Sequence, residues 1–463
     1  MMQAQLSNSS RRSCFLLLGL LVVAACSEQA PVAPLAPESA LAARGGGQGP
    51  TVRSTDPDSA TVDTTLNVHV FGSGFDVGSR ADWAFKGVVS DKIVTNSTQF
   101  VSANELVANI TIARNADLGS HDVIVTTAAG KPGMGTELFV VTLKTTDLGT
   151  LGGTTSRARQ INNSGDIVGE STLSDGSMRA AYWTRVSANA WTIRQLSASP
   201  DEFQSGVGAI NDAGVVAGWF YYRSSDGSTQ QDPVRWTSSS AAAENLVPLG
   251  IDAGGINLAG QIVGEMNVSG IRRGFRWENG VVTDLGGFGG GPSAAWGINS
   301  TGVIVGIGRA TPQGVFRAVV WRMGVITELP MLPGGTSHAF AHEINDDGVI
   351  VGSSPVASGE WHAVRWVPAS GEPSGYRIED LGYPNSIARD INNNGAIVGH
   401  YHVHNGVERA FYWHPTRGKM DLPALSGNAY RLAFGINDAG EVVGHGVKNG
   451  SSAEHGIVWT GIP

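Results

Sequence analysis

The chain has 463 residues, of which 40 are acidic and 31 are Lys or Arg, so its formal net charge is −9 at pH 7. An acidic chain without a run of basic residues is a poor candidate for nucleic-acid binding, and we expect no nucleic-acid partner. Only Cys14 and Cys26 occur. Because Cys14 lies in the predicted export signal described next, the mature chain can form no internal disulfide and must be stabilised by core burial.

Residues 1–25 are predicted to be an export signal. Two arginines precede the apolar run 15–23, which is too short to span a bilayer stably. The run ends in Val-Ala-Ala-Cys, which resembles a bacterial lipobox and implies that Cys26 carries a lipid anchor. An ordinary secretory signal that ends in cysteine is the alternative. Ser27, in place of an aspartate, resembles outer-membrane sorting, so we expect an exported, lipid-anchored protein at the outer membrane or cell surface.

Residues 26–50 and 51–143 are predicted to be a tether and a β-sandwich. The first segment contains four prolines and no apolar periodicity, which is typical of a disordered linker. The second has β-rich runs separated by turn residues at sandwich-like spacing. Its strings GSGF (72–75) and FVSANELVANI (100–110) resemble an IPT/TIG domain, which implies an immunoglobulin-like fold that acts as a spacer or a binding module. We favour the spacer.

From residue 144 to residue 463 the chain repeats. The string I-N-x-x-G-x-[IV]-[VA]-G occurs seven times, at spacings of 49, 46, 42, 46, 47 and 45 residues. A period in this range is typical of solenoids, propellers and arrays. The Asn and the first Gly of the seven strings are Asn162 and Gly165, Asn211 and Gly214, Asn257 and Gly260, Asn299 and Gly302, Asn345 and Gly348, Asn392 and Gly395, and Asn437 and Gly440.

Each string is predicted to be a tight hairpin turn. Asparagine can hydrogen-bond its own backbone, and glycine accepts a positive φ. Calcium binding is the alternative, because the strings are rich in oxygen atoms. Charge comes only from Asp212, Asp346, Asp347 and Asp438, however, and several repeats have none, so we favour a structural turn.

Each repeat also has an upstream Leu preceded by a mostly polar residue and a downstream β-run that ends in tryptophan. With no helical periodicity, this pattern indicates about four short strands per repeat and therefore a seven-bladed β-propeller. Runs such as RAAYW (179–183) and RAFYW (409–413) resemble the HAF-type extracellular repeat. The repeats begin with the last-strand landmark at Asp147 and end with a third strand at Trp459. We therefore expect the strand at 147–151 to complete the last blade, and the repeated tryptophans to pack between blades.

Function is expected on the face opposite the uniform hairpins, where the segments 219–231, 307–316 and 353–361 vary. The expected function is non-catalytic binding or scaffolding, with a surface polysaccharide or protein as partner. The alternative is a secreted carbohydrate-active hydrolase or lyase that uses carboxylates from different blades. No catalytic motif is present, no catalytic residue is assigned and no cofactor is expected. The unranked carboxylates are Asp201, Glu202, Glu360 and Asp380.

The string HYHVH supplies one metal hypothesis. His400, His402 and His404 alternate, and alternate residues of a strand share one face, so three imidazoles would converge on a transition metal with His414 as a fourth ligand. A solvated strand without metal is the alternative, and we favour it.

Overall fold

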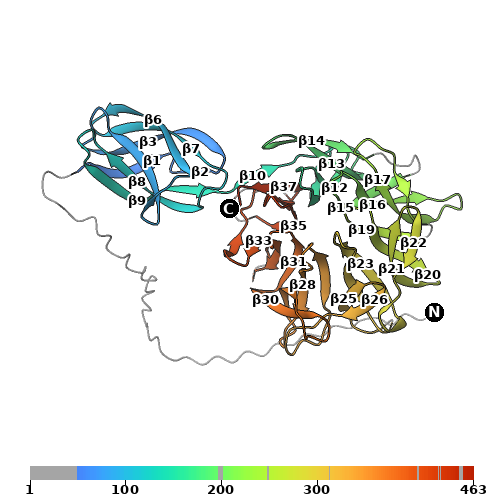
Figure 1. Cartoon of the computed structure of the whole chain (residues 1–463). Helices are drawn as coiled ribbons and strands as arrows, with labels where there is room; N and C mark the ends of the chain where they lie inside the picture. Colours follow the sequence, from blue (N-terminus) through green and yellow to red (C-terminus); the bar gives the residue numbers. More distant parts are fainter. Residues whose placement is uncertain are drawn as a thin grey trace, which may run out of the picture. The chain divides into compact units, whose positions relative to one another are not determined.

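The computed structural model describes residues 49–196, 202–247, 250–311, 313–403, 406–425, 427, 429–447 and 452–462 (Figure 1). These residues form 37 β-strands and one short 3-10 turn, η1 (Phe288–Gly290), so the all-β prediction is confirmed for this part of the chain. The same residues include no helix with the length and apolarity needed to cross a membrane. Cys26, Asp201 and His404 lie outside the described residues.

The first nine strands form two sheets around one core. Their orders are β1-β3-β7-β6 and β2-β9-β8-β4-β5, and β2 pairs with β9 in parallel. In β7 the alternating residues Leu106, Ala108 and Ile110 are fully buried because successive side chains of a strand point to opposite faces. Trp83 packs edge-on against Phe139, with 5.9 Å between ring centroids. The strands are β1 (Thr51–Asp56), β2 (Ser59–Thr61), β3 (Thr64–Ser73), β4 (Arg80–Phe85), β5 (Val88–Val89), β6 (Ile93–Ser102), β7 (Glu105–Ile112), β8 (Gly119–Thr126) and β9 (Pro132–Thr142).

Seven four-stranded antiparallel sheets follow, which we number in chain order. Sheets 1 to 3 contain β11 (Ser156–Ile161), β12 (Ile167–Thr172), β13 (Met178–Ser187), β14 (Ala190–Gln195); β15 (Glu202–Ile210), β16 (Val216–Arg223), β17 (Thr229–Trp236), β18 (Glu244–Asn245); and β19 (Gly250–Ile256), β20 (Ile262–Val268), β21 (Ile271–Glu278), β22 (Val281–Asp284). Sheets 4 to 6 contain β23 (Ser293–Ile298), β24 (Ile304–Gly308), β25 (Arg317–Arg322), β26 (Val325–Glu328); β27 (Phe340–Ile344), β28 (Ile350–Pro355), β29 (Trp361–Pro368), β30 (Tyr376–Pro384); and β31 (Ser386–Ile391), β32 (Ile397–His402), β33 (Glu408–His414), β34 (Gly418–Asp421). Sheet 7 contains β35 (Arg431–Ile436), β36 (Val442–Val447), β37 (Glu454–Thr460) and β10 (Lys144–Asp147).

Sheet 7 is completed by a strand from the start of the repeat region. β10 pairs with β37 in the register Lys144↔Thr460 to Asp147↔Ile457. The predicted pairing is thus confirmed, although the strand ends at Asp147 rather than beginning there. The first strand of each sheet contacts the first strand of the next, and β35 contacts β11, so the seven first strands form a closed ring. The strands that begin and end the repeats therefore pair with each other, and β37 is not left as an edge strand.

The repeated tryptophans link neighbouring sheets, as predicted. Trp183 of sheet 1 is fully buried, and its indole Nε1 donates to the carbonyl of Leu148, which follows β10 of sheet 7, at 2.8 Å. Trp321 of sheet 4 repeats this contact at 3.0 Å with Leu285, which follows the last strand of sheet 3. An indole that is apolar except for one donor suits this buried position. Trp413 departs from the pattern because it is only half-buried.

The last glycine of each repeat string allows two backbones to approach. A β-carbon at Gly169 would lie 1.9 Å from the carbonyl oxygen of Arg157 on the paired strand, and Gly352 is equally crowded by Phe340. The group that approaches this glycine is the backbone of the first strand, which leaves no space for a β-carbon.

Candidate functional site

The seven repeat strings form the hairpins that join the first and second strands of the sheets. In sheet 1 the Oδ1 atom of Asn162 accepts hydrogen bonds from the backbone N–H groups of Ser164 at 3.1 Å and Asp166 at 2.9 Å. Gly165 has a φ of 81°, which a side chain would strain. The predicted turn chemistry is confirmed, since the asparagine holds its own loop and the glycine takes the left-handed conformation.

The same asparagines form a closed ring of hydrogen bonds, which we call the asparagine ring. All seven are buried, with 3–6% of each residue exposed. Each side-chain Nδ2 donates to the backbone carbonyl of the corresponding asparagine in the next sheet. The bonds run from Asn162 to Asn211 (3.2 Å), Asn211 to Asn257 (3.0 Å), Asn257 to Asn299 (3.0 Å), Asn299 to Asn345 (3.1 Å), Asn345 to Asn392 (3.1 Å), Asn392 to Asn437 (2.9 Å) and Asn437 back to Asn162 (3.1 Å).

The asparagine ring surrounds a cavity of about 230 Å³ at the hairpin end of the channel between the first strands. Its wall is built from the residues around Ile-Asn in all seven sheets. This volume holds several water molecules but is small for a drug-sized ligand. The cavity lies at the uniform end of the repeats, so it adds no support to the expected site among the variable segments, which stays a prediction.

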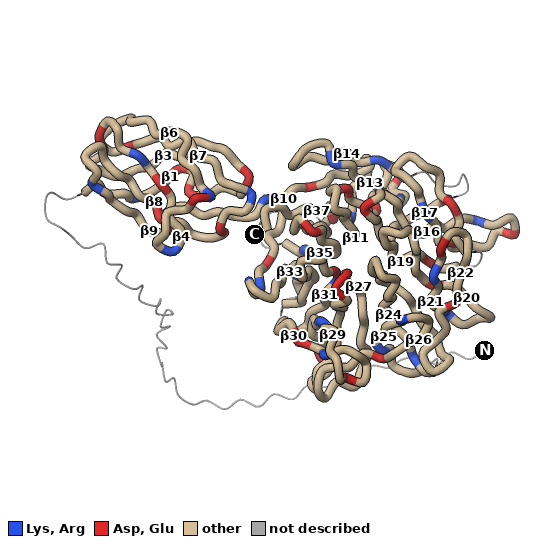
Figure 2. Tube along the Cα trace, in the orientation of Figure 1, with Lys and Arg blue, Asp and Glu red and all other residues tan. Residues whose placement is uncertain are grey.

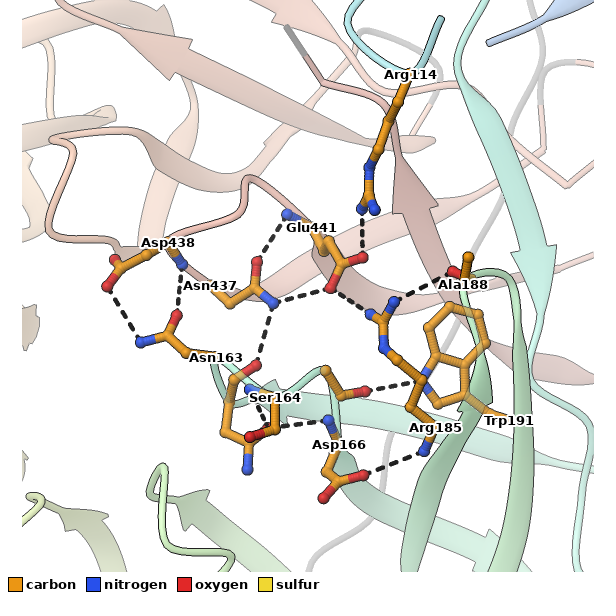
Figure 3. A network of polar contacts seen from close by, with 12 residues as sticks. Arg114, Asn163, Ser164, Asp166, Arg185, Ala188, Trp191, Asn437, Asp438 and Glu441 are labelled. Carbon is orange, nitrogen blue, oxygen red and sulfur yellow. Dashed lines mark hydrogen bonds and ion pairs between the residues drawn. The ribbon is translucent and has the colours of Figure 1, made fainter. Parts of the chain in front are cut away.

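The residues that follow the ring asparagines also bond from sheet to sheet. The backbone N–H of Asn163 donates to Asp212 at 2.8 Å, and that of Asp438 donates to the Oδ1 atom of Asn163 at 2.8 Å. Figure 3 shows this link beside the bond from Asn437 Nδ2 to Glu441, which measures 2.9 Å. Glu441 also accepts from Arg185. These carboxylates accept protein donors, which favours the structural turn over the calcium hypothesis.

Two carboxyl groups meet at the cavity wall in neighbouring sheets. Both oxygens of Asp390 accept backbone donors, from Ile391 and Ile436, at 2.8 Å each. Desolvation raises the pKa of Asp390 to about 7, against these hydrogen bonds. Desolvation, and then the charge of Asp390, raises the pKa of Glu343 well above its ordinary value. Sequence reasoning missed this pair, although Glu343 and Asp390 occupy the same place before Ile-Asn in two consecutive repeats.

Every first strand contains a β-bulge at the same place. In sheet 1 the pairing register shifts between Ala158 and Gln160, and the corresponding shift occurs in the other six sheets. A bulge leaves one residue outside the ladder and re-aims its side chain, and bulges are frequent beside active sites. The seven bulged residues, which we call the bulge ring, are Arg159, Gly208, Gly254, Trp296, His342, Arg389 and Phe434.

The bulge ring lies one layer from the cavity wall and differs in chemistry from sheet to sheet. The residue before each bulge is Ala or Val and packs in the core, as Ala158 and Ala388 do. The residues of the bulge ring are half-buried where they carry large side chains, as at Trp296 and Phe434. Aligning the seven repeats would have revealed a variable position after a constant Ala or Val, but not that a bulge takes this position out of its ladder.

Sheets 4 and 5 contribute an aromatic wall. The rings of Trp296 and His342 stack with centroids 5.3 Å apart and planes at 10°, and Phe340 stacks on His342 at 6.2 Å. Trp361 meets Phe340 edge-on at 5.6 Å and is 38% exposed. Such a run of parallel rings is a surface on which a flat apolar face can stack.

Sheets 6, 7 and 1 contribute a basic wall centred on Phe434. The guanidinium carbons of Arg159 and Arg389 lie 4.8 and 5.4 Å from the centroid of this ring. The ring of His445 stacks on it at 5.2 Å, and that of His400 lies at 6.1 Å. Along the rest of the described chain, basic and acidic residues are interspersed (Figure 2), so the basic wall is a local feature.

The histidines of HYHVH lie in two environments. His400 is buried, with 3% exposed, and its Nδ1 atom has no hydrogen-bond partner. His402 is exposed, with Nε2 3.2 Å from a carboxylate oxygen of Glu408. The Nε2 atom of His414 lies 3.2 Å from the carbonyl of Asn394. Among the described residues, which exclude His404, no group of three His, Cys, Asp or Glu side chains is placed to hold a metal. The metal hypothesis stays a prediction.

Three of the unranked carboxylates, Glu202, Glu360 and Asp380, are described, and none of them belongs to the bulge ring. Glu202 is buried on β15 beside Arg179, at 3.8 Å. Glu360 is exposed before β29, and Asp380 pairs with His362 at 2.8 Å.

Comparison with known proteins finds β-propellers among the similar solved structures but names no family. The chain covers the β-propeller domain of the Trilobed protease from Pyrococcus furiosus completely, at 8% identity over 82% of this chain and a TM-score of 0.42. Virginiamycin B lyase from Staphylococcus aureus matches at 12% identity, 69% of this chain, 99% of that chain and a TM-score of 0.41. The Hadza microbial sialidase Hz136 matches at 10% identity, 89% and 94% coverage and a TM-score of 0.37. No protein-family model and no curated protein matches the chain. These likenesses concern architecture only.

Proposed function

We propose that this protein is an exported binding lipoprotein in which the central channel, including the bulge ring, takes the ligand. In this proposal an IPT/TIG-like, immunoglobulin-like sandwich is a spacer, and the HAF-type repeats form a seven-bladed propeller that recognises a surface polysaccharide or protein. The supporting observation is the bulge ring. One position in each of seven sheets lies outside its ladder, and its chemistry varies while the residue before it stays Ala or Val.

The aromatic wall fits this role. Trp296 and Phe340 offer ring faces that are only half-buried, although burial on a folded core would have stabilised the protein.

A glycan array and a panel of envelope proteins, probed with the mature full-length protein in detergent micelles, test the proposal. We expect a ligand whose affinity falls about tenfold in Trp296→Ala, since one lost aromatic contact is worth about 1.4 kcal/mol. Trp191→Ala, in the outer strand β14, is the matched control and retains affinity. Equal loss in both variants, or a ligand indifferent to Trp296, contradicts the channel as the site.

A second function is favoured by one observation, the carboxyl pair Glu343 and Asp390. These two carboxyl groups come from the first strands of adjacent sheets, and a raised pKa suits either of them to the proton donor of a glycoside hydrolase. Against it, both oxygens of Asp390 already accept backbone hydrogen bonds, so this group has little capacity to act on a substrate. A polysaccharide hydrolysis screen decides: turnover that is lost in Glu343→Gln supports the enzyme and contradicts the binding protein.

The membrane anchor is tested separately. We propose that Cys26 is lipidated and holds the protein at the outer membrane or cell surface. Metabolic labelling with a fatty-acid analogue should label the wild type and not Cys26→Ser, and the variant should move to the soluble fraction. Unlabelled wild-type protein in the soluble fraction would support the ordinary secretory signal instead.

A further inference from the structure

Arg389, the bulged residue of sheet 6, is a cation without a counter-ion. It forms no hydrogen bond and no ion pair with any residue that the structure describes, and its buried Nε atom has no partner. Its one recorded contact is with the ring of Phe434, at 5.4 Å. Desolvation, and then the charge of Arg159, lowers the pKa of Arg389 to about 10, so the group is still charged at neutral pH.

The groups around Arg389 do not neutralise it. Burial lowers the pKa of His342 and of His400 well below the ordinary value, with the charge of Arg389 as the next cause, so both imidazoles are neutral. Two acidic groups on this side of the channel pair with other arginines, Glu170 with Arg159 (2.9 Å) and Glu454 with Arg157 (2.5 Å). Glu408 lies 3.2 Å from His402, and its charge acts on Arg389 without forming an ion pair with it.

A partly buried charge of this kind is costly unless something pairs with it. The guanidinium has parallel N–H donors that match two oxygens of one carboxylate or phosphate. The buried Nδ1 atom of His400, which also has no partner, stands on the next strand of the same sheet. Arg389 and Phe434 are only half-buried, so a solute in the channel can reach them.

We propose that Arg389 binds an anionic oxygen group of the ligand, a carboxylate or a phosphate, in the basic wall of the channel. This inference rests on the proposed binding function and names the chemistry of its ligand. The anion would lie against the guanidinium of Arg389, close to Phe434 and to the second guanidinium beside that ring, that of Arg159. It would supply the counter-ion that the protein lacks.

The test uses thermal unfolding of the mature full-length protein with sodium phosphate, sodium glucuronate, glucose or sodium chloride at matched ionic strength. We expect phosphate or glucuronate, present at about ten times its dissociation constant, to raise the Tm by about 3 °C. Glucose and chloride should not. A shift with phosphate alone assigns a phosphoryl group, and one with glucuronate alone assigns a carboxylate. No shift with either anion overturns the proposal.

Arg389→Met should abolish the anion shift, whereas Arg322→Met, at an exposed arginine of sheet 4, should retain it. Without ligand, Arg389→Met should be as stable as the wild type or more so, since an unpaired charge has been removed. If Arg389→Met does not fold, Arg389→Lys is the second variant. It keeps the positive charge but loses the parallel N–H donors of the guanidinium, and it should weaken anion binding at least tenfold. A shift that persists unchanged in Arg389→Met or in Arg389→Lys overturns the proposal. A neutral glycan that binds through Trp296 while neither anion shifts the Tm would uphold the binding function and reject this inference alone.

Discussion

The asparagine ring and the bulge ring lie three residues apart in each of the seven repeats, yet they use their polar groups in opposite ways. Each asparagine is identical, buried and fully bonded, with Oδ1 holding its own turn and Nδ2 holding the next sheet. The bulge ring has seven positions with five residue types, and Arg389 has no bond at all to a described residue. The comparison separates residues that close the structure from residues that remain available to a ligand.

The difference shows that recurring residues and residues found in a single sheet have different roles in this repeat architecture. Residues that recur in every sheet satisfy one another, because each finds the same partner at the same place in the next sheet. A residue that occurs in one sheet has no such partner. Repetition therefore indicates structure here, and departures from repetition at an equivalent position indicate function.

The largest effect is expected from a change that disrupts the closure on which both rings depend. Replacing residues 144–147 by Gly-Ser-Gly-Ser keeps the chain length but removes the regular pairing of β10 with β37. We expect the Tm to fall by more than about 10 °C, because sheet 7 loses a strand and exposes an edge. The same replacement at 370–373, an exposed loop between β29 and β30, is the control and should change the Tm little. An unchanged Tm in the first variant would show that the ring does not depend on β10.

A smaller effect is expected from a substitution that disrupts only the asparagine ring. Asn299→Ala removes the donor to Asn345 and the acceptor for the backbone of Thr301 and Val303. Leaving buried groups unbonded should cost about 2–3 kcal/mol, measured by denaturant unfolding. Ser300→Ala, at the next and exposed residue, is the matched control and should cost less than about 0.5 kcal/mol. Equal losses would mean that the ring adds nothing to the turn.

A third prediction concerns the pH dependence of stability that arises from Glu343, which lies between the bulge ring and the asparagine ring in the sequence. The carboxyl of Glu343 has an ordinary pKa of 4.5, and its pKa in the folded protein is well above that value. Between the two, the folded protein keeps a proton that the unfolded chain has lost, so the free energy of unfolding falls as the pH rises from about 4.5 through the folded pKa. The amide in Glu343→Gln resembles the protonated carboxyl and does not titrate, so the variant lacks this fall in the free energy of unfolding.

Measured by Tm, Glu343→Gln should therefore gain stability relative to the wild type as the pH is raised from 5 to 8. Glu360→Gln, at an exposed position outside the channel, is the control for the change of residue type. A Tm difference that is constant with pH would mean that Glu343 is ionised in the folded protein.

The smallest expected effect concerns His400 and His402, which lie on the second strand of sheet 6. Because His402 faces Glu408 while His400 is buried, we expect zinc to change the Tm by less than about 1 °C, in the wild type and in His402→Ala alike. A zinc shift in the wild type that disappears in His402→Ala would restore the metal hypothesis. His414→Ala distinguishes a three-ligand site from a four-ligand site in that case.

Sequence patterns predicted most of the architecture because the determining chemistry is local. Asn162 and Gly165 specify a turn within five residues, and alternation specifies the strands on either side. The offset between Asp147 and Trp459 predicted that a strand near Asp147 completes the last sheet, because an unpaired edge strand is unfavourable. The family resemblances and the lipid anchor remain predictions of the sequence.

Only the tertiary structure decided where the candidate site lies. The amide of each ring asparagine bonds a carbonyl 42 to 49 residues away, or 275 residues away where Asn437 meets Asn162, and nothing in one repeat reveals that direction. The bulge that turns Arg389 or Trp296 out of its ladder, and the meeting of Glu343 with Asp390, likewise depend on how adjacent sheets pack. Turn and strand propensities depend on neighbouring residues and can be read along the chain. Which side chains share the channel depends on the closure of all seven sheets, a property of the assembled ring that no single repeat contains.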